Sequence, residues 1–320
     1  MRCTRPLTVG FQSDGKTLCW SQKKYSKEFA PFQLPCGKCI SCRLIQAREK
    51  AVRCVHEASM YGDKNTFLTL TYSDENLESD RLIYAHAQKF IRDLRYRFPE
   101  NPIPTVVTGE YGPSKKRPHW HILLFNFTPP DKVAGKKNKQ GDILYTSKII
   151  DEIWSRNNSK ESPSQIGPID LSTAGYVCRY QLKKQEHGSE NDLYKPIVRY
   201  SSKYAIGKSY IEENWKKVFS LGYVQVNSSE KIKIPRYYES WLKAHHPDEF
   251  EKYVLNTKVN IQAMFRKIAD KEELEYRKSE LLRISKAALN SRLWSKEITK
   301  NQMREIILAQ KSELIKAHDL

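Results

Sequence analysis

Hydrophobic positions recur along the chain with two different periods, and these periods separate expected helices from expected strands. Residues 41–61 carry apolar side chains three and four positions apart, and residues 84–98 repeat that spacing up to Pro99. Both segments are therefore predicted to be helices. Residues 67–72 instead alternate between apolar and polar side chains and are rich in β-forming residues, which predicts a strand.

Two further strands are predicted at residues 105–110 and 119–125, where β-branched and aromatic residues predominate. The segment between them, residues 111–118, is dense in turn-forming and basic residues, so the two strands are expected to form a hairpin with a long basic loop. The order strand, helix, strand, strand, helix favours an α+β fold in which an antiparallel sheet is flanked by helices.

The pattern is weaker in the following segment. Residues 128–142 are expected to form a loop that contains Lys and Gly. Short helices are expected at residues 149–155 and 173–184, and a strand is expected at residues 222–226.

The chain divides into three parts on these criteria. Residues 1–45 are turn-rich, contain cysteines and show little periodicity, whereas residues 46–235 contain the predicted sheet. Beyond Pro235 the chain is predicted to be helical and heavily charged to its end. We therefore predict an N-terminal cysteine segment, a main domain and a helical C-terminal region at residues 236–320.

The charge balance indicates a polyanionic partner. Lys and Arg number 55 against 37 Asp and Glu, which gives a formal net charge of +18 and favours nucleic acid first and an anionic membrane second. No apolar run approaches the roughly 18 to 20 residues that span a bilayer, and the first residues lack the apolar segment of a signal peptide. We expect a cytoplasmic protein without a membrane segment.

A pair of histidines on one predicted strand is the clearest candidate for a metal site. His119 and His121 lie two residues apart, so both imidazoles face one side of the strand, whereas Trp120 faces the core. Glu110 ends the partner strand and can supply a carboxylate. This donor set, with open positions, suits a divalent ion that also takes substrate oxygens. For the histidine pair alone, two ordinary polar residues on an exposed strand are an equal alternative.

A pair of tyrosines is the second candidate for chemistry. Tyr176 and Tyr180 lie four residues apart on one face of a predicted helix, and Lys183 follows within a turn. A phenol, whose unperturbed pKa is about 10, is a poor nucleophile near neutral pH. It becomes effective when a metal polarises the phosphate and nearby cations stabilise the developing phenolate. Packing of one or both tyrosines in the core is the competing interpretation.

In their order and spacing, these motifs resemble those of the HUH endonucleases, and within them the replication initiation proteins of microviruses, especially the gokushovirus branch. The motifs that carry the resemblance are FLTLTY at 67–72, GEYG at 109–112, RPHWH at 117–121 and YVCRYQLK at 176–183. The runs CGKCISCR at 36–43 and RCVHEA at 53–58 also look like that branch. The resemblance covers roughly residues 1–240.

The resemblance implies an origin-nicking and joining endonuclease of rolling-circle replication of a single-stranded DNA phage genome, with a 5′-phosphotyrosine intermediate. It also implies the antiparallel sheet flanked by helices that the element order favours. Its partners would be single-stranded or origin DNA, and possible further partners are the helicase and polymerase of the host. By position, the resemblance assigns catalysis to Tyr176, Tyr180 and Lys183, and a Mg²⁺ or Mn²⁺ ion to His119, His121 and Glu110.

A cysteine cluster is a candidate zinc site. Cys36, Cys39 and Cys42 are separated by two-residue gaps, which suit paired thiolates on a structural zinc ion. Such a site takes four ligands, and the candidates for the fourth are Cys3, which is the best, followed by Cys19, Cys54 and His56. Free thiols in a cytosolic protein explain the seven cysteines equally well.

Basic loops are candidates for contacts with DNA phosphates. Lys115, Lys116 and Arg117 lie beside the predicted metal site. The next loop adds Lys132, Lys136, Lys137 and Lys139. Lysines on loops are also common on any solvated surface, so no single one is assigned a contact.

Two other functions are compatible with the same residues. One is a zinc-dependent nucleic-acid-binding protein without catalysis, in which the histidines and tyrosines are structural. The other is a transposase or plasmid relaxase of the HUH superfamily, although the cysteine segment favours the phage branch. Both imidazoles and a phenol oxygen at one shared site would support the enzyme, whereas burial of Tyr176 and Tyr180 in an apolar core would support the binding protein.

Overall fold

The computed structural model describes most of the first 261 residues and separates them into compact units. The described ranges are 3–15, 17–112, 115–137, 141, 143–155, 163–186, 196–226 and 231–261, with 263, 264, 267 and 271; of residues 180–186 only the backbone is described. One unit comprises Met1–Gln46 and Asn260–Leu320, and the other comprises Ala47–Val259. None of the described helices is both long and apolar enough to cross a membrane.

The smaller unit contains a three-stranded antiparallel sheet. Its order is β2 (Leu18–Cys19), β1 (Leu7–Phe11), β3 (Phe32–Leu34), and a 3-10 turn (Gln22–Lys24) follows β2. Strands of two to five residues are too short to show a clear alternation. This explains why the sequence of the segment shows little periodicity.

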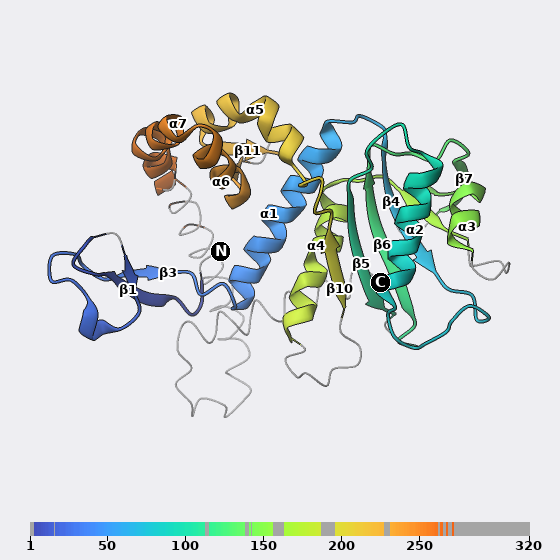
Figure 1. Ribbon diagram of the computed structural model, residues 1–320, viewed down its shortest axis with the longest axis horizontal. Helices are drawn as coiled ribbons and strands as arrows, with labels where there is room; N and C mark the ends of the chain where they lie inside the picture. Colours follow the sequence, from blue (N-terminus) through green and yellow to red (C-terminus); the bar gives the residue numbers. More distant parts are fainter. Residues whose placement is uncertain are drawn as a thin grey trace, which may run out of the picture. The chain divides into compact units, whose positions relative to one another are not determined.

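The larger unit is built on a seven-stranded sheet, which confirms the predicted α+β fold (Figure 1). The strand order is β10-β5-β6-β4-β9-β8-β7, and neighbouring strands are antiparallel throughout. The strands are β4 (Asn65–Thr71), β5 (Thr105–Tyr111), β6 (Pro118–Phe125), β7 (Val133–Lys137), β8 (Ile143–Thr146), β9 (Gln165–Gly167) and β10 (Ile197–Tyr200).

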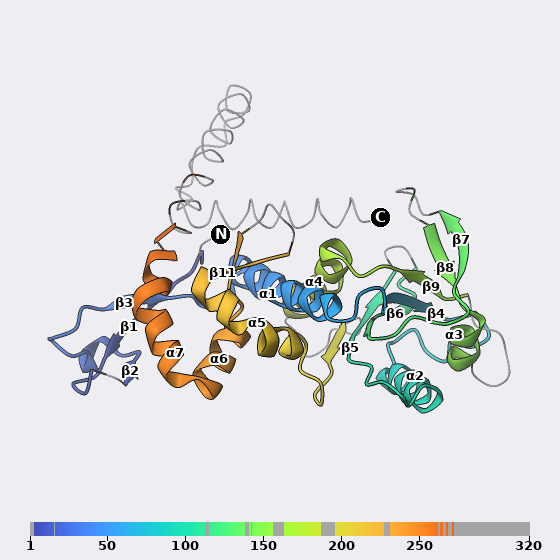
Figure 2. The same ribbon diagram turned by 90° about the horizontal axis from the view of Figure 1, so that it is seen from above.

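Helices cover both faces of this sheet (Figure 2). α2 (Tyr84–Arg97) and α3 (Lys148–Trp154) pack on the face that carries Trp120, which confirms that this residue faces the core. The part of α1 (Ile40–Ser59) within this unit and α4 (Leu171–Glu186) pack on the opposite face. Because side chains alternate along a strand, the face beneath α4 is also the face of His119 and His121.

A third core completes the larger unit. α5 (Lys208–Leu221), β11 (Tyr223–Gln225), β12 (Lys231–Lys233), α6 (Arg236–His245), α7 (Pro247–Lys252) and a π-helix (Tyr253–Lys258) supply its residues together with α1. Val52, Phe219, Tyr238 and Leu242 are buried there. The helical region that was predicted from residue 236 onwards thus begins within this unit. The division into three domains stays a prediction.

Several elements differ from the sequence predictions. The expected loop at 128–142 contains β7, which the prediction missed because its five residues are all exposed and do not alternate. The helix at 208–221 was also missed: it follows Gly207, which adopts a left-handed conformation (φ 80°), and no capping side chain marks its start.

Candidate metal centre and active site

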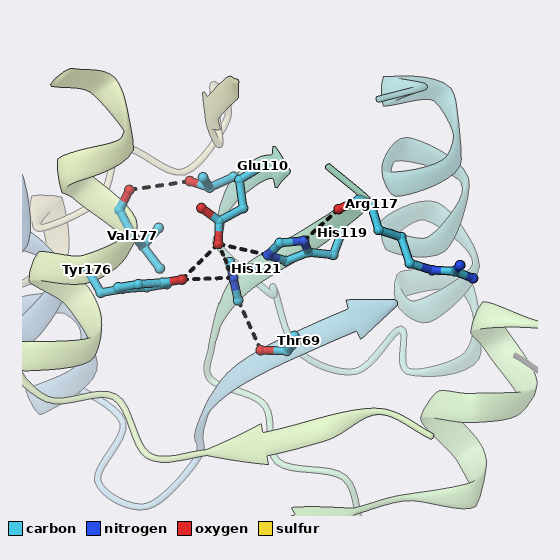
Figure 3. Close-up of polar contacts among 8 residues, drawn as sticks. Thr69, Glu110, Arg117, His119, His121, Tyr176 and Val177 are labelled. Carbon is cyan, nitrogen blue, oxygen red and sulfur yellow. Dashed lines mark hydrogen bonds and ion pairs between the residues drawn. The ribbon is translucent and has the colours of Figure 1, made fainter. Parts of the chain in front are cut away.

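Three side chains from the central hairpin converge on one point (Figure 3). The register of β5 and β6 places Glu110 directly opposite His119, and His121 lies two residues further along the same face. One carboxylate oxygen, Oε1 of Glu110, lies 2.8 Å from Nε2 of His119 and 2.8 Å from Nε2 of His121. The structure thus brings together the three residues that were predicted to hold a metal.

The outer nitrogen of each imidazole is held by the protein. His119 Nδ1 lies 3.2 Å from the Arg117 carbonyl oxygen, and His121 Nδ1 lies 3.0 Å from Thr69 Oγ1. The carbonyl can only accept, so His119 donates from Nδ1, and its Nε2 is the nitrogen that presents a lone pair toward Glu110. Such contacts orient imidazoles that bind metals.

The electrostatics of the site favour a bound cation. Burial of Glu110 raises the pKa of its carboxyl group, but hydrogen bonds from His119 and His121 outweigh this effect and hold the pKa well below its ordinary value. The buried carboxylate therefore carries its charge. A carboxylate oxygen and an imidazole lone pair that face each other require a positive centre between them, either a proton or a metal ion.

The spacing also fits a divalent ion. Ligands at about 2.1 Å from a metal in octahedral geometry lie about 3 Å apart when they are adjacent. The two 2.8 Å separations of the donor atoms match that value. Glu110, His119 and His121 would occupy three positions and leave the others for water or substrate oxygens.

The phenol of Tyr176 shares this site. Its hydroxyl donates to Oε1 of Glu110 over 2.8 Å and lies 3.4 Å from Nε2 of His121. Its ring is half-buried and stands edge-on to the imidazole of His121, with ring centroids 5.2 Å apart. Two imidazoles and a phenol oxygen thus meet at one point, which is the arrangement that favours the enzyme over the binding protein.

Helix α4 holds this tyrosine in place through its apolar face. Ala174, Val177 and Cys178 are fully buried against the sheet and α1. Thr108 Oγ1 also donates to the Val177 carbonyl over 3.4 Å. Tyr180 and Lys183 lie on the same helix, but their side chains lie outside the described residues.

The basic loop beside the site is placed by a salt bridge. Arg117 donates from its guanidinium to the Tyr72 carbonyl over 2.6 Å and pairs with Asp74 at 2.5 Å, while Lys115 and Lys116 are exposed. Arg117 is therefore tied to β4, and its own carbonyl faces His119. Contacts of these three residues with DNA stay a prediction.

Thr69 is a residue that the sequence reasoning missed. It lies opposite His121 on β4 and orients the imidazole of that histidine. The alternation of residues 67–72 was a signal, since Thr69 shares a face with Phe67, whose ring stacks on His121 with centroids 5.5 Å apart. The pairing of β4 with β6 was still needed to identify its partner.

The smaller unit gathers the predicted cysteine cluster. The sulfurs of Cys3, Cys36, Cys39 and Cys42 all lie within 4.8 Å of one another. Cys3 Sγ is 3.5 Å from that of Cys36 and 3.7 Å from that of Cys39. Backbone N–H groups of Cys36 and Cys39 donate to sulfur over 3.3 and 3.2 Å.

The other candidates for the fourth position have different surroundings. Cys19 Sγ donates to the Ser21 carbonyl, and Cys54 is buried in the core beneath α4. His56 lies 3.0 Å from the Tyr238 hydroxyl and 3.2 Å from the Gln225 carbonyl, and its burial lowers its pKa to about 4. Cys3 is therefore the fourth member of the cluster.

Comparison with known proteins places the chain among phage proteins. A family of replication-associated proteins of the ORF2 type matches residues 65–185, which contain the metal centre and Tyr176. Replication-associated protein VP4 of Bdellovibrio phage phiMH2K is 42% identical over 283 residues, which cover 86% of this chain and 88% of that protein. No solved structure matches the chain.

Two more distant relatives carry similar names. Replication-associated protein ORF2 of Spiroplasma virus 4 is 29% identical over 272 residues, covering 78% of this chain and 83% of that protein. Replication-associated protein ORF4 of Chlamydia phage 1 is 28% identical over 235 residues, covering 68% and 55%. With the site lying in the matched segment and the similarity extending over most of its length, the chain belongs to the family of phage replication-associated proteins.

Proposed function

We propose that this chain is an endonuclease that nicks and rejoins single-stranded origin DNA for rolling-circle replication of a single-stranded DNA phage genome. The observation that carries the proposal is the meeting of the Tyr176 hydroxyl with Glu110, His119 and His121 around one oxygen atom. A nucleophile next to a site for a divalent cation is what phosphodiester cleavage requires.

The reaction that fits these residues is a transesterification. The Tyr176 oxygen forms a bond to the scissile phosphorus, the bond from phosphorus to the 3′ oxygen breaks, and the released 3′ hydroxyl takes up a proton. Glu110 holds the phenol in place through the hydrogen bond that it accepts. A Mg²⁺ or Mn²⁺ ion, bound by Glu110, His119 and His121, would polarise the scissile phosphate. Lys183 is proposed to stabilise the developing charge, and Tyr180 to act as a second nucleophile.

Joining follows from the same chemistry. One phosphodiester is exchanged for another, so the energy of the broken bond is kept in the tyrosyl ester. A 3′ hydroxyl can attack that ester and reseal the strand without a cofactor that supplies energy. The named relatives are replication-associated proteins of phages, which favours this role over that of a transposase or relaxase.

The proposal is tested by a search for the covalent intermediate. The purified chain, incubated with Mn²⁺ and a labelled pool of single-stranded oligonucleotides, is expected to yield a protein–DNA adduct that survives denaturation. The adduct should carry label only when the label lies on the 3′ side of the cleaved bond. Binding of the pool without any adduct, in Mg²⁺ or Mn²⁺, would support the non-catalytic alternative. Assays with the helicase and polymerase of the host would test the other predicted partners.

A second metal is proposed for the smaller unit. A tetrahedral zinc ion with bonds of about 2.3 Å to sulfur separates its ligands by about 3.7 Å. The distances of 3.5 and 3.7 Å from Cys3 Sγ match that separation. Backbone N–H groups that point at sulfur favour thiolates over thiols. We propose that these four cysteines hold one structural zinc ion, which ties the start of the chain to the first turn of α1.

Zinc content and stability test this site. Because metal binding is coupled to folding, the purified protein is expected to contain about one zinc ion per chain, and chelation is expected to lower its melting temperature. The variant Cys36→Ser/Cys39→Ser should lose the zinc, whereas Cys19→Ser, which alters a buried thiol outside the cluster, should keep it. A wild-type protein that is free of zinc and melts at the same temperature with and without chelator would identify these residues as free thiols.

A further inference from the structure

The strands β7 and β8 form a two-stranded ribbon at one edge of the seven-stranded sheet, at the end opposite to α1 and α4 (Figure 2). The residues of β5 and β6 are almost all buried, whereas all five residues of β7 are exposed. Both faces of β7 are therefore open to solvent. The ribbon has the form of a projecting element and adds little to the core.

The base of the ribbon is anchored to α3. Asp131 accepts a hydrogen bond from the Ser147 hydroxyl over 2.5 Å and another from the Ile149 backbone N–H over 3.0 Å. These bonds join the residues that precede β7 to those that follow β8. The register shifts by one residue between Ala134 and Lys137, and such a bulge increases the twist of a ribbon.

The ribbon is positively charged. Residues 132–146 contain four lysines and one aspartate. Lys132, Lys136 and Lys137 are exposed, and the carboxylate of Asp131 next to them is occupied at the base. Lys132 Nζ lies 4.2 Å from the centroid of the Tyr145 ring. This ring is therefore covered by a cation, so it does not offer a free face for stacking on an unpaired base.

We propose that the ribbon formed by β7 and β8 binds duplex DNA that flanks the cleavage site, with Lys136 and Lys137 against its phosphates. A two-stranded ribbon fits the major groove of a duplex, which is about 12 Å wide. A single strand would instead need exposed aromatic rings. The proposal names the form of DNA that the chain holds beside its active site, and to that extent it rests on the proposed function.

The distance between the ribbon and the metal centre suits this role. β7 is separated from β6 by four steps in the strand order, which amounts to about 19 Å at about 4.8 Å a step. Base pairs rise by about 3.4 Å, so this distance corresponds to five or six base pairs. The ribbon would contact the duplex about half a helical turn from the scissile phosphate.

Lysines on an edge strand have a second possible role, because they prevent the strand from pairing with another chain. The two roles differ in what they predict about salt. Each phosphate contact contributes about 0.9 to the slope of the logarithm of affinity against the logarithm of salt concentration. Edge protection contributes nothing to that slope and affects only aggregation.

The test measures binding to a hairpin oligonucleotide that joins a duplex to a single-stranded cleavage site. The variant Lys136→Ala/Lys137→Ala is expected to bind it with a slope reduced by about 1.8. Its adduct formation on a short single-stranded oligonucleotide should equal that of the wild type. The matched control is Lys216→Ala/Lys217→Ala, which removes the same charge from exposed positions of α5 and should reduce the slope less.

An unchanged slope, or an equal reduction in both variants, would overturn the proposal. Aggregation of the ribbon variant with an unchanged slope would overturn it as well and identify the lysines as edge protection. The proposed function is judged separately, since its failure is a lack of adduct on the single-stranded oligonucleotide in the wild type itself.

Discussion

Replacing His119 and His121 with alanine is expected to abolish DNA cleavage while leaving DNA binding largely intact. The two imidazoles lie 2.8 Å from Glu110 Oε1, so their loss leaves one of the three donors of the proposed metal site. Metal polarisation of a phosphate is worth several kcal/mol, so the rate of adduct formation should fall by about a thousand-fold or more. Binding should persist because phosphate contacts from Lys and Arg supply most of the affinity.

The controls separate a loss of chemistry from a loss of fold. The single variant His119→Ala removes the more exposed imidazole, whose side chain is 17% exposed against 8% for His121, and should already be inactive. His245→Ala, an exposed histidine on α6, should cleave like the wild type. Melting temperatures and salt-dependent DNA binding are measured for each variant. Full nicking by the double variant, or by the wild type in excess EDTA, would contradict the proposed mechanism.

Replacing Tyr176 and Tyr180 together with phenylalanine is expected to eliminate the covalent adduct. Tyr→Phe removes only the hydroxyl, and at Tyr176 that hydroxyl lies 2.8 Å from Glu110 Oε1 and 3.4 Å from His121 Nε2. Tyr180 lies one helical turn further along α4 and is proposed as the second nucleophile. In rolling-circle replication the first tyrosine is still esterified when the origin returns, so a second nucleophile is needed. Each single variant should therefore form some adduct but fail in a linked second cleavage and ligation.

The outcomes of this series assign the nucleophiles. An exposed tyrosine outside the site, Tyr96 on α2, provides the matched control, and Tyr96→Phe should behave as the wild type. If Tyr176→Phe alone removes all adduct, Tyr180 does not attack and the alternating mechanism is wrong. If the double variant still forms the adduct, the nucleophile lies elsewhere. The measurement is the yield of adduct and of religated strand on a substrate with two cleavage sites.

Local geometry was enough to predict part of the metal centre. On any strand, residues two apart share a face, so His119 and His121 had to point in one direction and Trp120 in the other. The turn-rich segment at 111–118 made a hairpin the natural partner, which brought Glu110 into range. The order of elements along the chain also predicted the α+β fold, because periodicity and turn residues are properties of short segments.

Contacts between distant segments decided the rest. The site acquires Tyr176 only because the apolar face of α4 packs on the same face of the sheet as the histidines, and Thr69 only because β4 pairs with β6. Cys3 joins Cys36 across a separation of 33 residues. β7 is a strand because β8 lies beside it, although its exposed residues carry no alternation. Periodicity records which face of an element is buried, but the partner that buries it is set by packing and backbone pairing between segments far apart in the chain.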